Sequence, residues 1–221
     1  MADDLKTPVP SSVSVFAQRS TVTLLVGTDE EPLVAHESYT KKNSEFFQAA
    51  VMKEWVEGQT RVIKLPEDDV ETMTNYLTFT YSCELPISKL VKGRPARMNV
   101  DWDSLAKLYV LGERIRDKCV RNAITSEIAR VSVLPDENGA SGFMPAAASN
   151  ILFDGTPEGS PIRQMIIDKH VSGGHKRWLD SGNDHPALVL EIARELLGKV
   201  AVHQPYGEFR KRQIKAEDYF V

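Results

Sequence analysis

The sequence predicts an α+β chain in which a small β-sheet caps a cluster of helices. Short runs rich in Val, Leu and Ile, bounded by turn residues, occur at residues 21–36 and 60–66. Apolar residues then recur three or four positions apart at residues 67–85 and 101–130, which is the spacing of amphipathic helices. The expected order is therefore strand, strand, helix, strand, helix, loop, helix, helix.

Composition predicts a soluble globular protein without a membrane span. The chain has 221 residues, 42% of them hydrophobic, and its apolar runs are far shorter than the ~20 residues of a membrane-spanning helix. A net charge of -4 gives no general attraction to nucleic acid. The start MADDLKTPVPSS lacks the basic and apolar parts of a secretory signal, and we expect Cys83 and Cys119 to be buried free thiols. These features favour an intracellular location, in the cytoplasm or nucleus.

The first strands are expected to form a hairpin. TVTLLV places Val22, Leu24 and Val26 on one face, GTDEEP supplies a turn, and LVAH resumes the extended run up to His36. After a helix, TRVIKLP is a third strand that Pro66 ends.

Helices are expected on both sides of this third strand. Asn43 or Ser44 can cap the first, which we expect to end at Gly58. The next begins with Asp68 as its N-cap and Glu71 three residues later, a capping-box spacing. Several aromatic residues recur at helical spacing and are expected mostly in the core: Phe46, Phe47, Trp55, Tyr76, Phe79 and Tyr81.

Two further helices, near residues 101–115 and 116–130, are expected to form a hairpin, the first capped by Asp101 or Asp103. We interpret residues 131–160, rich in Gly, Pro, Ala and Ser, as a mobile linker. A helical segment follows at residues 161–205, in which Asp184 is a cap candidate and Leu188, Ile192 and Leu196 share one side.

Residues 1–19 are interpreted as a flexible leader and residues 206–221 as a tail that is basic and then acidic. The basic cluster FRKRQIK in this tail is typical of a solvated end, with a nuclear-import signal as the alternative.

Residues 20–130 resemble a BTB/POZ domain of the fungal branch. The resemblance rests on the combined order of VTLLVG, LVAHESYTKKNSEFF, VIKLPEDDVETMTNYLTFTYSCEL and LAKLYVLGERIRDKCVRNAITSEI. TPEGSPIRQMIIDKHV and PALVLEIARELL are similar to the segment that often trails the domain in fungal members.

This resemblance implies a non-enzymatic protein–protein interaction module, either a homo-oligomerising adaptor or a substrate-recruiting subunit of a cullin-based ubiquitin ligase. The expected partners are proteins, a second copy or a cullin scaffold among them, with no small-molecule substrate and no cofactor. The family's use of helices after the third strand suggests Met73, Tyr76 and Tyr109 as a contact surface. His36 is implied to be structural, its ring holding a loop through local hydrogen bonds.

Two alternatives stay open. One is a BTB-containing regulator of transcription. The other is a small hydrolase that uses His170 or His175 and brings a Ser or acid within ~3 Å of the histidine. A metal site is not expected, because the histidines are scattered and no cysteine pair has the spacing of metal ligands.

Overall fold

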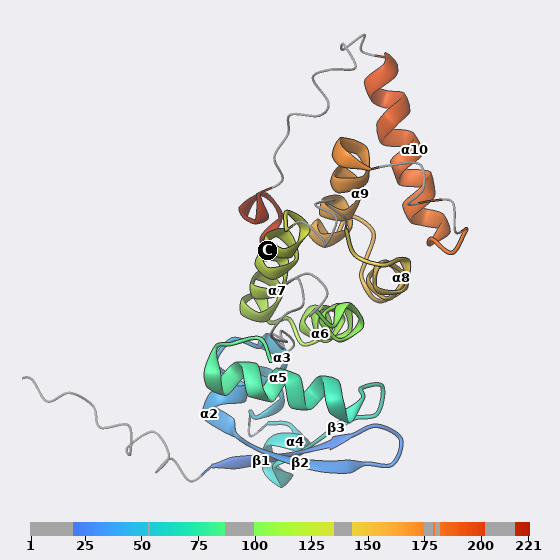
Figure 1. Cartoon of the computed structure of the whole chain (residues 1–221). Coiled ribbons are helices and arrows are strands. Elements are labelled where there is room, and N and C mark those ends of the chain that lie inside the picture. Colours follow the sequence, from blue (N-terminus) through green and yellow to red (C-terminus); the bar gives the residue numbers. More distant parts are fainter. Residues whose placement is uncertain are drawn as a thin grey trace, which may run out of the picture.

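The computed structural model describes residues 20–52, 54–86, 100–134, 143–174, 179, 182–201 and 215–221. The expected leader at residues 1–19, the polar loop at residues 88–97 and most of the basic cluster lie outside these residues. Figure 1 shows the β-sheet at one end of the molecule and the last long helices at the other.

The sheet has three strands in the order β2-β1-β3. β1 (Thr21–Val26) pairs antiparallel with β2 (Glu31–His36) and parallel with β3 (Val62–Leu65). The expected alternation is confirmed, because Val22, Leu24 and Val26 are buried. Gly27 allows the hairpin turn, since its φ of 76° is a conformation that other residues rarely adopt.

Three short helices connect β2 to β3: α2 (Glu37–Thr40), α3 (Glu45–Ala50) and α4 (Val56–Thr60). Ser44 caps α3, because its Oγ accepts a hydrogen bond from the Phe47 amide at 3.2 Å. The prediction of a single helix that ends at Gly58 is wrong, since the first helix ends at Ala50 and Gly58 lies inside α4. A Cβ at Gly58 would lie 1.9 Å from the Met52 carbonyl oxygen, so this tight return needs glycine.

The central helices are α5 (Val70–Ser82), α6 (Trp102–Arg114) and α7 (Lys118–Ser132). Asp101 caps α6 as expected, accepting from the Ser104 amide at 3.0 Å. The hairpin of α6 and α7 is also confirmed, and its tight turn is capped by Asp117.

The structure differs from the mobile linker expected at residues 131–160. α7 continues to Ser132, and residues 146–155 form α8 (Ala146–Gly155), in which Leu152 and Phe153 are buried. The small residues that resembled a linker allow α8 to pack closely on α6, with Ala148 and Ser149 buried. Residues 135–142 of this stretch lie outside the described residues.

The outer layer contains α8, α9 (Pro161–Gly173) and α10 (Pro186–Ala201), as Figure 1 shows. Arg163 of α9 donates to the backbone oxygens of Phe153 and Thr156, which satisfies carbonyls at the end of α8. One hydrophobic core runs from Leu24 in the sheet to Leu188 in α10. A short 3₁₀ helix, η4 (Ala216–Tyr219), packs against α7 and α9.

Candidate protein-interaction surfaces

The three residues suggested as a contact surface lie in the core. Met73, Tyr76 and Tyr109 are each 0% exposed, so their assignment to a contact surface is wrong for this structure. The physical reason is that α5 contacts β2 and α2 on one side and α6 on the other. Helical spacing identified an apolar face but could not show that another helix covers it.

Tyr76 belongs to a buried polar network that joins three parts of the fold. Its hydroxyl donates to Asp117 Oδ2 at 2.9 Å, and Asp117 Oδ1 accepts from the amides of Cys119 and Val120. Ser44 pairs with Asp117 in a β-bridge and donates to the Ile115 carbonyl at 2.6 Å. Burial and the neighbouring Asp117 carboxylate raise the pKa of Tyr76 well above its usual range. This network fixes α3 and α5 to the α6–α7 turn.

His36 lies at the end of β2 and contacts α5. Its backbone amide donates to the Tyr81 hydroxyl at 2.9 Å, and its ring Nδ1 lies 2.9 Å from the same oxygen. The Tyr81 ring also packs on Tyr39, with 4.5 Å between ring centroids. The ring of His36 therefore contacts α5, 45 residues away in sequence, as well as the nearby Tyr39 ring in α2.

The N-cap of α5 is one residue later than expected. Asp69 caps the helix, since its Oδ1 accepts from the Thr72 amide at 2.8 Å. Burial opposes ionisation of Asp69, but the hydrogen bonds from Thr72 outweigh it and lower its pKa. Asp68 is instead buried and forms an ion pair with Arg114 of α6. Glu71 lies in the first turn of the helix, so the expected reciprocal pairing of Asp68 and Glu71 is replaced by the Asp69 cap.

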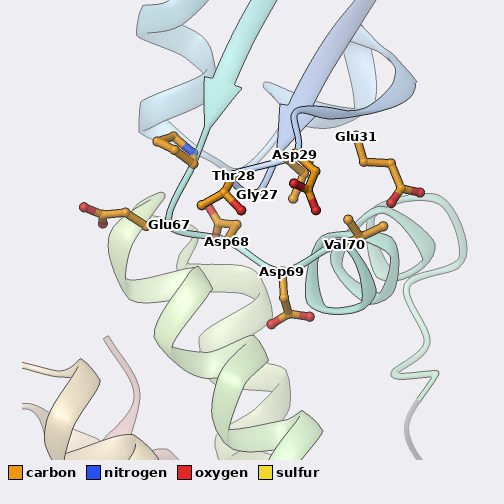
Figure 2. Close-up of a pocket in the computed structure, with 10 residues that line it drawn as sticks. Gly27, Thr28, Asp29, Glu31, Glu67, Asp68, Asp69 and Val70 are labelled. Atoms are coloured by element: carbon orange, nitrogen blue, oxygen red, sulfur yellow. The ribbon is translucent and has the colours of Figure 1, made fainter.

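An acidic depression of about 390 Å³ lies between the β1–β2 turn and the β3–α5 turn. Figure 2 shows carboxylates from both turns around it, and the acidic residues that line it are Asp29, Glu31, Glu67, Asp68 and Asp69. Arg114 neutralises part of this charge, because it pairs with Asp68 and lies 3.3 Å from Glu67 Oε2. The remaining negative charge would repel a phosphate or carboxylate ligand.

Only one of the two histidines named for a hydrolase, His170, lies within the described residues. His170 Nδ1 lies 2.8 Å from the Ile166 carbonyl oxygen in its own helix, so this nitrogen acts as the donor. Burial lowers the pKa of His170. His175 lies outside the described residues. In the ranges that the structure describes, no group of three or more His, Cys, Asp or Glu side chains is placed to hold a metal ion.

Both cysteines are exposed, which corrects the expectation of buried thiols. Cys83 ends α5 in the left-handed conformation, with φ of 59°, and Cys119 lies in the first turn of α7. Burial of its sulfur nevertheless raises the pKa of Cys119, and the Asp117 carboxylate adds to this effect.

Among the described residues of the outer layer, the exposed large hydrophobic side chains gather on one face of α10. Its inner side is covered, with Leu188 and Ile192 buried. Next to this buried side, two pairs of apolar residues seven positions apart remain open to solvent: Val189 at 41% with Leu196 at 42%, and Leu190 at 50% with Leu197 at 68% exposed. We call these four residues the α10 stripe. Leu196 was expected on the same side as Leu188, but its exposure places it in the stripe.

Two surface features were missed by sequence reasoning. The α10 stripe could have been found from the sequence, because α10 has apolar residues on two sides. A helix that buries a single face needs apolar residues on that face alone. The docking of η4 had no such signal, because it depends on where α7 and α9 lie.

The sequence matches no known family model, and no curated protein matches it. None of the helices in the described part of the chain is both long and apolar enough to cross a lipid bilayer.

Proposed function

We propose that this chain is a non-enzymatic protein–protein interaction module of the BTB/POZ type, and that it self-associates through the α10 stripe. The element order supports the family assignment, because two paired strands, short helices, a third strand and the α5–α7 helices follow one another as the resemblance implies. The observation that carries the proposed function is the exposed α10 stripe.

The stripe is self-complementary when a second copy packs antiparallel to it. A two-fold axis between Ile192 and Ala193 places Val189 of one copy opposite Leu196 of the other. The Val189–Leu196 contact thus occurs twice in this register, and this self-complementarity favours a second copy over an unrelated partner.

The size of this contact sets its strength. Residues 189–197 span about 12 Å of helix at the usual rise of 1.5 Å per residue. A patch of this length is small beside standard interfaces, so we expect a dimer that forms at micromolar concentration and dissociates on dilution.

Light scattering during size-exclusion chromatography tests the proposal. The wild-type chain should approach the mass of two copies as its concentration rises. Val189→Lys with Leu196→Lys should hold it at one copy, because four lysines would then meet in the interface. Val34→Lys with Val133→Lys adds the same charge at exposed valines elsewhere and should leave the dimer intact.

A second sample with a cullin N-terminal fragment separates the two adaptor roles. A complex that survives the α10 substitutions would show that the chain binds the scaffold through another surface. A wild-type chain that stays monomeric at every concentration would contradict self-association.

A further inference from the structure

Residues 216–221 pack against both α7 and α9, and we call the surface that they cover the α7–α9 groove; it is separate from the α10 stripe. Ala216 and Tyr219 are buried, while Glu217 and Asp218 are exposed and Phe220 is 40% exposed. Figure 1 shows this segment lying beside α7, away from the β-sheet. Alternate parts of the segment thus face the protein and the solvent.

The groove binds the backbone of this segment through one side chain. Asn122 of α7 accepts from the Val221 amide at 3.0 Å through Oδ1, and its Nδ2 lies 3.5 Å from the Val221 backbone oxygen. The backbone at Phe220 is extended, with φ of -72° and ψ of 153°. An amide side chain that pairs with both the N–H and the oxygen of one residue holds an extended peptide whatever its side chains are.

Side-chain recognition comes from a single buried tyrosine. The Tyr219 side chain enters the groove, where its hydroxyl donates to Asp168 Oδ2 of α9 at 2.7 Å. Gln164 donates to the other oxygen of Asp168 at 3.0 Å and so orients the carboxylate. A phenylalanine at this position would leave that acceptor without its donor, and a phosphotyrosine would be repelled by it.

We propose that the α7–α9 groove is a docking site for peptides in which a tyrosine ends a 3₁₀ turn and the backbone after it is extended, and that the chain's own residues 216–221 occupy it. The attached segment competes with any peptide from a partner, because a tethered ligand has an effective concentration in the millimolar range. The groove is therefore self-masked, and partner binding requires residues 216–221 to leave.

Fluorescence anisotropy with a labelled KAEDYFV peptide, blocked at both ends, tests this on the full chain. Tyr219→Ala removes the buried anchor of the attached segment and should free the groove. We expect this variant to bind the peptide at least tenfold more tightly than the wild-type chain. Adding Asn122→Ala or Asp168→Ala should reduce the affinity at least tenfold, whereas adding Arg130→Ala, whose side chain is 54% exposed near the end of α7, should not.

Two altered peptides test the tyrosine contact itself. The peptide with phosphotyrosine should not bind, and the peptide with phenylalanine should bind more weakly than the original. Circular dichroism verifies that each variant is folded. If Tyr219→Ala unfolds the chain, Tyr219→Phe replaces it, because this variant keeps the ring and weakens the binding of residues 216–221 less. The proposal would be overturned if the peptide bound the wild-type chain and the Tyr219→Ala variant equally, or if it did not bind that variant at about 1 mM. It would also be overturned if Asn122→Ala left the peptide affinity unchanged.

Discussion

The Tyr76 hydroxyl donates a hydrogen bond of 2.9 Å to Asp117 Oδ2 in the interior, and this contact joins α5 to the start of α7. Asp117 is 0% exposed, so its carboxylate depends on protein donors alone. The Tyr76 ring also stacks on Phe47, with 6.1 Å between centroids, which extends the connection to α3.

Tyr76→Phe should lower the free energy of unfolding by about 1–3 kcal/mol, because it leaves Asp117 Oδ2 without this donor. Tyr109→Phe is the matched control. The Tyr109 hydroxyl is equally buried and interacts with Ser160, but it makes no hydrogen bond of normal geometry among the described residues, so its removal should cost less stability than Tyr76→Phe. Urea unfolding measures both, and equal effects of the two substitutions would contradict the network.

Asp69→Ala should cost about 1 kcal/mol, the usual effect of losing an N-cap. The reason is that the Thr72 amide and hydroxyl, 2.8 and 2.7 Å from the Asp69 oxygens, would lose their acceptor. Asp68→Ala should act differently, because it removes the partner of Arg114. Combining each substitution with Arg114→Ala separates the two roles: only the Asp68 effect should depend on Arg114.

Stability should fall at acid pH partly through Glu37. Burial opposes the charge of this carboxylate, yet Lys41 at 3.0 Å and Arg61 at 2.6 Å outweigh it and lower the pKa of Glu37 below its ordinary value of 4.5. A lowered folded-state pKa gives stability that is present above 4.5 and is lost as the pH falls through the folded-state pKa. Unfolding measured from pH 7 to pH 3 should therefore show a smaller loss for Glu37→Gln than for the wild type.

The docking of α8 on α6 depends on the absence of a side chain at Gly155. A Cβ there would lie 2.5 Å from both methyl groups of Val110. Gly155→Ala should destabilise the fold by about 1–3 kcal/mol despite the better helix propensity of alanine. Val110→Ala should relieve the clash, so the double variant should be more stable than the sum of the single effects implies. Additive effects would show that the two helices do not pack as described.

Periodicity predicted the regular elements of the fold because each has one buried face. The alternation of Val22 and Leu24 in β1 and the apolar spacing in α5, α6 and α7 follow from this requirement. The break after Ala50 escaped the same reasoning, because apolar residues on both sides of it keep a helical spacing. The sequence could not show whether Asp68 or Asp69 caps α5, because either of two adjacent aspartates can be an N-cap and the choice shifts the start of the helix by only one residue.

The surfaces were harder to predict than the core elements. The segment from Ala146 to Gly155 was interpreted as a linker because its small residues offer little apolar area, yet small residues are what close helix packing requires. Met73, Tyr76 and Tyr109 were assigned outward although α5 and α6 cover one another. A pattern in one helix shows that a face is apolar, but the neighbouring helix decides whether that face is exposed.

Disulfide crosslinking of the α10 stripe tests the proposed self-association most directly. Val189→Cys with Leu196→Cys is introduced in a chain whose Cys83 and Cys119 are replaced by serine. The two new cysteines lie about 10 Å apart along one helix, too far for a bond within a copy. A covalent dimer should form under mild oxidation, and none should form from Val133→Cys. The proposed self-association would be contradicted if the variant with both α10 cysteines stayed monomeric at the concentrations used in the light-scattering experiment.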